Sequence, residues 1–112
     1  MLPEGYTAVV ARGEHWRGEV TTEPYETAWA KEAIFFLRAL KIEGDVQGIM
    51  AKVQISADGL HWADEGSTVE LPAAVDRVTF VRLKHFGGFL RLSVSVPNGS
   101  SVQIVASLNL KA

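Results

Sequence analysis

The stretch that decides the fold runs from residue 89 to residue 110 and reads FLRLSVSVPNGSSVQIVASLNL. Apolar and polar side chains alternate along both halves, as they do along strands that bury one face. Between the halves lies Pro97-Asn98-Gly99, and Asn-Gly between alternating segments is a strong hairpin signal. The alternating apolar residues are Leu90, Leu92, Val94 and Val96 before the turn, and Val102, Ile104, Ala106, Leu108 and Leu110 after it. Because an isolated hairpin is marginal in water, we expect this pair to form one edge of a larger antiparallel sheet.

Segments that precede this stretch show the same rhythm. Residues 49–56 alternate apolar and polar side chains and lead into the turn Ser56-Ala57-Asp58-Gly59, where Asp and Gly supply turn geometry. Residues 78–83 carry apolar side chains on both faces, which predicts a strand covered on both sides. With about eight short strands and turn signals roughly every 8–12 residues, the pattern predicts an all-β, single-domain antiparallel β-sandwich of the jelly-roll kind.

The segment 26–42, ETAWAKEAIFFLRALKI, fits two structures. Its composition favours a helix, and apolar residues stand at helical spacing at Trp29, Ala33, Phe36, Leu37 and Leu40. A strand fits as well, because Ile34, Phe36, Leu40 and Ile42 share one face that Arg38 interrupts. The turn signal Glu43-Gly44-Asp45 and the clear strand after it favour a strand over 33–42, preceded by a short helical turn.

The beginning of the chain is less regular. We expect residues 1–30 to form an N-terminal arm or edge strands, attached to a sandwich core of residues 31–112, in one domain overall. Pro24 restricts Glu23 to extended backbone, which suits either an arm that reaches a neighbouring subunit or an edge strand.

Composition narrows the classes of function. A chain of 112 residues can bury a core without cross-links, and it contains no cysteine for a disulfide or a thiolate site. The formal net charge is −2 and the basic residues are dispersed, so neither nucleic acid nor a membrane is an expected partner. The first residues lack the basic and apolar regions of a signal peptide, so we expect the chain to act in the cytoplasm or within an assembly.

The titratable residues do not form a recognisable reactive set. The histidines His15, His61 and His85 are not spaced as the converging ligands of a zinc site. Asp58, Asp64 and Glu65 flank Trp62, where they could serve as an acid–base pair or hold calcium, but turns favour such residues for backbone reasons. We therefore expect no catalytic residue, no metal, no cofactor and no enzymatic activity.

Aromatic residues are the remaining candidates for a binding surface. Trp16, Tyr25, Trp29 and Trp62 could form a platform that stacks on sugars, or they could pack in the core and at interfaces. We expect contacts through the N-terminal residues Trp16, Tyr25 and Trp29 and through the turn at His61-Trp62.

Two segments carry a resemblance to a known group of proteins. The run KVQISADGLHW at 52–62 resembles the strand and Ser-x-Asp-Gly-x-x-Trp turn of small β-sandwich proteins in tailed bacteriophage particles. The strand at 88–96 and the ending Leu108-Asn-Leu-Lys111 follow in the same order. The resemblance implies a non-enzymatic structural subunit of a virion, such as a capsid-decorating or tail-associated protein. It would form homo-oligomers, bind a larger protein assembly and reside in the virion.

The same turn is similar to one in discoidin-like and carbohydrate-binding sandwiches. There Val81-Arg82-Leu83 would match a later strand of the family, whereas residues 1–33 have no clear counterpart. This second resemblance implies an alternative function, a glycan-binding module that uses Trp62 and neighbouring loop residues.

Overall fold

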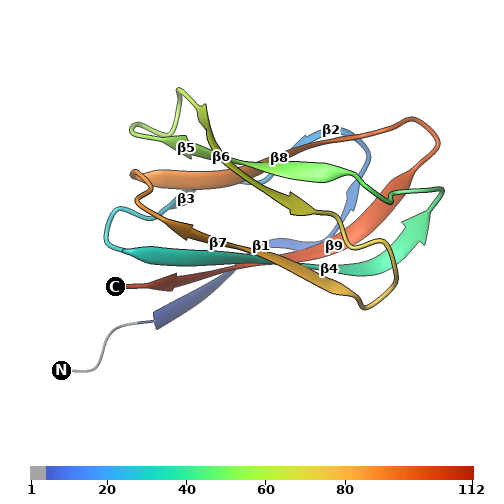
Figure 1. Ribbon diagram of the computed structural model, residues 1–112, viewed down its shortest axis with the longest axis horizontal. Coiled ribbons are helices and arrows are strands. Elements are labelled where there is room, and N and C mark those ends of the chain that lie inside the picture. The colour runs from blue at the N-terminus through green and yellow to red at the C-terminus, as the bar shows by residue number, and fades with distance from the viewer. Residues whose placement is uncertain (1–4) are drawn as a thin grey trace.

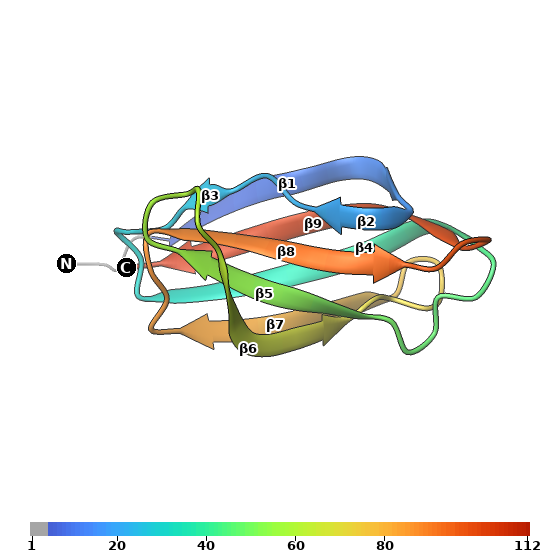
Figure 2. The same cartoon turned by 90° about the horizontal axis from the view of Figure 1, so that it is seen from above.

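The computed structural model describes residues 5–112, which form nine strands in two stacked antiparallel sheets (Figures 1 and 2). The strands are β1 (Gly5–Trp16), β2 (Gly18–Thr21), β3 (Tyr25–Glu26), β4 (Glu32–Glu43), β5 (Met50–Ser56), β6 (Ala63–Glu70), β7 (Val78–Lys84), β8 (Phe89–Val96) and β9 (Ser101–Lys111). Sheet A has the order β1-β9-β4-β7, and sheet B has the order β2-β8-β5-β6, with β3 also paired to β8. In this part of the chain no helix is long and apolar enough to cross a bilayer.

The strand order is that of a jelly roll. Strands β2 and β3 pair with different parts of β8, so together they occupy one position in sheet B. With that position counted once, the chain changes sheets at every connection except the β5–β6 hairpin. This alternation between layers produces the two interleaved Greek keys of a jelly roll, and the predicted fold class is confirmed.

The terminal stretch forms two strands as predicted, but the predicted hairpin is wrong. Strand β8 lies in sheet B and β9 in sheet A, so the turn at Asn98-Gly99 joins the two layers. The Ser100 N–H donates to the Pro97 carbonyl at 3.1 Å, and Gly99 has a φ of 86°. Both strands are interior strands with neighbours on each side, so the predicted edge position is wrong as well.

The reason for this difference lies in the phase of the alternation. A two-residue hairpin at Asn98-Gly99 would pair Val96 with Ser101, and directly paired residues point to the same face of a sheet. Apolar residues of one strand would then share a face with polar residues of the other. Crossing between the sheets places both apolar rows in one core, where Val96 and Val102 are fully buried.

Strand β4 (Glu32–Glu43) covers the residues 33–42 that were predicted as a strand, so that prediction is confirmed and the helix alternative is wrong. The face that enters the core consists of Ala33, Phe35, Leu37 and Ala39. Ile34 and Phe36 therefore lie on the outer face of sheet A. A single hydrogen-bonded turn, closed by the Ala30 N–H on the Thr27 carbonyl at 3.0 Å, replaces the predicted helical turn.

Residues 5–26 form edge strands of the same sandwich and not an extended arm. Strand β1 pairs with β9 at one edge of sheet A, and β2 pairs with β8 at one edge of sheet B. Trp16, at the end of β1, is 1% exposed and lies opposite Val102. The prediction that Trp16 contributes to a contact surface is therefore corrected, because its ring is part of the core.

Two glycines in the connection between β4 and β5 differ in how closely their surroundings pack against them. Gly44 has a φ of 72°, and an added Cβ would collide with the Gly99 carbonyl oxygen in the β8–β9 turn. Gly48 has a similar φ of 78°, but no atom lies within 4 Å of an added Cβ.

We expect Gly48→Ala to lower the free energy of unfolding by about 1–2 kcal/mol, the cost of left-handed backbone in a non-glycine residue. Gly44→Ala should cost at least about 1 kcal/mol more, because the collision is added. Urea denaturation of both variants measures the difference. Equal losses would show that the two loops do not press on each other.

Candidate functional site

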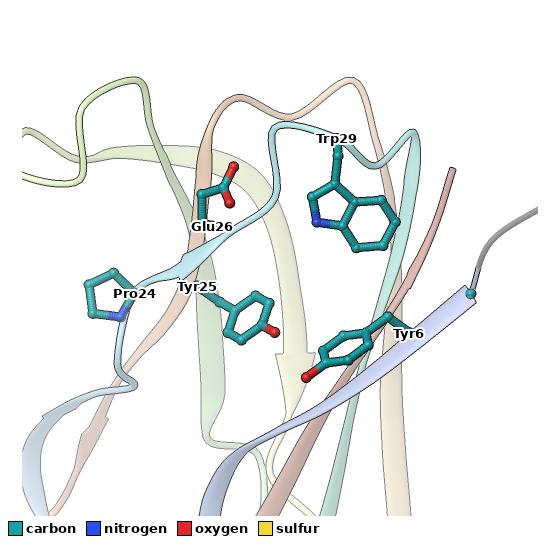
Figure 3. Close-up of a pocket in the computed structure, with 6 residues that line it drawn as sticks. Tyr6, Pro24, Tyr25, Glu26 and Trp29 are labelled. Carbon is teal, nitrogen blue, oxygen red and sulfur yellow. The ribbon is translucent and has the colours of Figure 1, made fainter.

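The end of the sandwich at which β1 begins carries an aromatic hollow of about 580 Å³. It is lined by Gly5, Tyr6, Pro24, Tyr25, Glu26 and Trp29. Figure 3 shows that Tyr6 comes from β1, Tyr25 from β3 and Trp29 from the loop that follows β3. The hollow therefore forms where an edge strand of sheet A meets β3 of sheet B.

The two tyrosine rings lie nearly parallel. Their centroids are 6.4 Å apart and their planes differ by 21°, so the two rings are stacked. Hydrogen bonding with the Tyr6 phenol raises the pKa of Tyr25 above its ordinary value, and partial desolvation and the charge of Glu26 act in the same direction. Tyr25 is therefore a neutral phenol at physiological pH and can both donate and accept hydrogen bonds.

Hydrogen bonds to two distant segments fix the loop that carries Trp29. The Thr27 N–H donates to the Gly88 carbonyl at 2.7 Å, and the Thr27 hydroxyl donates to the Gly87 carbonyl at 3.1 Å. The Lys31 N–H donates to the Lys111 carbonyl at 2.8 Å. The loop is thus bound to the β7–β8 connection and to the end of β9, while the Trp29 side chain remains 41% exposed.

The structure brings together two of the predicted contact residues, Tyr25 and Trp29, and adds Tyr6, which the sequence analysis missed. Tyr6 lies on the same strand face as the buried Ala8, so period-2 alternation could have assigned it to the inward face of β1. Its contact with Tyr25 depends on strand order, which local patterns do not specify. The other predicted residues, His61 and Trp62, lie in the β5–β6 hairpin, outside the lining of the hollow.

Asp58 organises the turn of that hairpin. Its Oδ1 accepts hydrogen bonds from the N–H groups of Leu60 at 2.8 Å and His61 at 2.9 Å. Its Oδ2 lies 2.7 Å from Nδ1 of His61, and the Ser56 hydroxyl donates to Oδ1 at 3.0 Å. These hydrogen bonds hold the pKa of Asp58 well below its usual range, and the bonds from His61 have the largest effect. All of these partners belong to the turn, so the Asp58 carboxylate has a structural role there.

Trp62 is covered on one face by a neighbouring strand. The Arg91 guanidinium lies 4.2 Å from the centroid of the Trp62 ring, as in a cation–π contact. Arg91 Nε donates to the Gln54 side-chain oxygen at 2.7 Å, and Gln54 in turn donates to Asp64 at 3.0 Å. A sugar that stacked on this face of Trp62 would have to displace Arg91 from both partners.

The other two carboxylates that flank Trp62 also have local partners. Lys52 lies 3.8 Å from Asp64, and Glu65 accepts a hydrogen bond from the Ser67 N–H at 2.9 Å. Among residues 5–112, no group of three or more His, Asp or Glu side chains is arranged to hold a metal ion.

The outer faces of the two sheets differ in chemistry. In sheet A the register places Val9, Ser107, Phe36 and Phe80 in one row across the four strands. The matching row across sheet B is Thr21, Ser93, Lys52 and Thr68. The row of sheet B is thus wholly polar, whereas three of the four residues in the row of sheet A are apolar; Met50, at the start of β5, is an exposed apolar residue on the outer face of sheet B.

The apolar face is most exposed at β7, which is the second edge strand of sheet A. Val78 is 50% exposed and Phe80 is 49% exposed. The Phe80 ring lies 6.0 Å from Phe36, and the Arg82 guanidinium lies 5.1 Å from its centroid. Residues 78–83 were predicted to be covered on both sides; within this chain only the inner face of β7 is covered.

These features define a jelly-roll sandwich with an aromatic hollow at one end and an apolar outer face on one sheet. The solved structure of the SPBc2 prophage-derived protein YomS is similar to it, with a TM-score of 0.66 at 7% sequence identity. The similarity covers 100% of this chain and 96% of that one, and at this identity it shows a shared fold. No protein-family model and no curated protein sequence matches the chain. The predicted resemblance to phage sandwiches is thus supported at the level of the fold.

The lowered pKa of Asp58 gives the stability a definite pH dependence. A carboxyl with a lower pKa in the folded chain stabilises the fold above about pH 4, where the unfolded carboxyl is ionised. That stabilisation is lost as the pH falls towards the folded pKa. We expect Asp58→Asn to reduce the difference between the free energies of unfolding at pH 7 and about pH 3, measured with urea.

His61→Ala serves as the matched control, because it keeps the backbone N–H that is the largest cause of the lowered pKa. It should retain most of the pH dependence. An Asp58→Asn variant with the full pH dependence of the parent would contradict this assignment.

Proposed function

We propose that this chain is a non-enzymatic assembly subunit of a bacteriophage particle and binds its neighbours through β7 and the outer face of sheet A. The observation that carries the proposal is the contrast between the two outer faces, with Phe36 and Phe80 on one and a wholly polar row on the other. Contiguous exposed apolar surface marks sites of contact with other proteins. The shared fold with a prophage-derived protein supports the phage class.

The edges of the sheets support the same surface. Strand β1 has register shifts between Val9 and Ala11 and between Arg12 and Glu14, and β6 has one against β5. The remaining edge of sheet B, β2, is four residues long. Bulges and short length are means by which proteins prevent edge pairing. Strand β7 instead pairs with β4 over seven residues without a shift, so its free edge is regular.

A second copy of the chain is the partner that β7 fits. In an antiparallel pair of β7 strands centred on Val81, Phe80 would face Arg82 and Val78 would face Lys84 of the other copy. No like charges would oppose each other, and the apolar faces of the two sheets would become continuous. Such a contact is isologous, the form found in most homodimers. Further subunits of a particle can then cover the joined apolar face.

Phe80→Glu places a charge in this surface and should shift the protein to the monomer. Sedimentation velocity over a range of protein concentrations measures the oligomeric state. We expect the parent to form dimers or larger oligomers and the variant to dissociate at concentrations at least about tenfold higher than the parent does.

Thr21→Glu is the matched control, since Thr21 is an exposed residue on β2, at the end of sheet B opposite to β6. It should associate like the parent. A parent chain that remains monomeric at every concentration, or equal effects of the two substitutions, would refute assembly through β7.

A further inference from the structure

We infer that the aromatic hollow of Tyr6, Tyr25 and Trp29 binds a neutral carbohydrate. Two of its rings are available to a ligand, because Tyr6 is 54% exposed and Trp29 is 41% exposed. The volume of about 580 Å³ lies in the range of small-molecule sites and accommodates a ligand of disaccharide size. This inference is independent of assembly through β7.

The arrangement of the rings favours a ligand with a flat apolar face. Tyr6 and Tyr25 are stacked, with planes that differ by 21°, so they are not the crossed rings of a cage. A cage of crossed rings would suit a quaternary ammonium group, which is bound over several ring faces at once. Exposed faces of tyrosine and tryptophan suit the C–H face of a pyranose ring, which stacks on them. In Figure 3 the Trp29 indole and the Tyr6 ring both lie at the hollow.

The charges of the lining residues exclude other ligand classes. Among the lining residues within 5–112 there is no Lys, Arg or His, and Glu26 is the one ionisable residue besides the two phenols. A carboxylate repels phosphate, acidic sugars and acidic peptides, whereas it accepts hydrogen bonds from sugar hydroxyls. A proline-rich peptide also stacks on aromatic rings, but its prolines offer carbonyl acceptors and no N–H for Glu26. The polar groups of the hollow therefore match a hydroxyl-rich ligand best.

The position of the rings is set before any ligand arrives. The hydrogen bonds of Thr27 to Gly87 and Gly88 fix the loop that carries Trp29. Preformed sites lose less conformational entropy on binding than mobile ones. The other two tryptophans are less suitable, since Trp16 is buried and one face of Trp62 is occupied by Arg91. The structure thus assigns sugar binding to Trp29 and not to Trp62.

Isothermal titration calorimetry with maltose, cellobiose, lactose and chitobiose, together with an array of bacterial surface glycans, tests the inference on the full chain. We expect at least one neutral saccharide to bind. Trp29→Ala and Tyr6→Ala should each weaken that binding at least about tenfold, by loss of stacking. Both side chains are exposed, so both variants should keep the thermal unfolding midpoint of the parent within a few degrees.

Two variants in the β5–β6 turn show whether saccharides bind at the aromatic hollow or at that turn. Leu60→Ala, at a residue that is 79% exposed in that turn, should leave binding unchanged. Binding that is lost in Trp62→Ala but kept in Trp29→Ala would overturn the assignment. So would the absence of binding to every neutral saccharide tested, or tighter binding of choline or of a proline-rich peptide than of any saccharide.

Discussion

The packing of β8 against β9 across the core is the contact on which the rest of the structure depends. The inward residues of both strands are fully buried, and they come from one continuous stretch of chain folded at the Asn98-Gly99 turn. Each strand lies inside its own sheet, so β2, β3 and β5 pair with one and β1 and β4 with the other. The stretch therefore supplies both the centre of the core and the paired backbone to which the other strands are added. Disruption of this contact would separate the layers and not only an edge.

Because the inward rows of the strands supply the core, the outward rows are free to differ between the sheets. Outward residues of β8 and β5 are mostly polar, among them Arg91, Ser93, Ser95, Lys52 and Gln54, and Met50 at the start of β5 is the apolar exception. Outward residues of β4 and β7 include Phe36, Phe80 and Val78, which water does not solvate well. A fold that needed sheet A only for its core would have no physical reason to retain aromatic residues there. The jelly roll thus allows an assembly surface to be placed on one face at no cost to the other.

Local alternation predicted the strands and the fold class, because the side-chain period of 2 is a local property. It did not predict which strands pair with each other. The apolar positions of β8 and β9 are both even-numbered, and a two-residue turn at 98–99 pairs even with odd positions. This mismatch was present in the sequence and pointed away from a hairpin. Trp16 was misassigned for a related reason, since nothing local shows that β1 ends against Val102. The aromatic hollow could not be predicted, because Tyr6 and Tyr25 approach each other only through the long-range order of the sheets.

The two proposed surfaces occupy opposite edges of sheet A, and this separation has a functional consequence. Tyr6 belongs to β1 and Phe80 to β7, with β9 and β4 between them. Three strand spacings of about 4.8 Å place these edges about 14 Å apart, before the width of the side chains is added. A neighbour bound along β7 therefore leaves the hollow uncovered, and a small ligand in the hollow does not reach β7. In a particle built from such subunits, the contact along β7 would leave the hollow of each copy uncovered, and weak binding of single sugars at open hollows would be multiplied by their number.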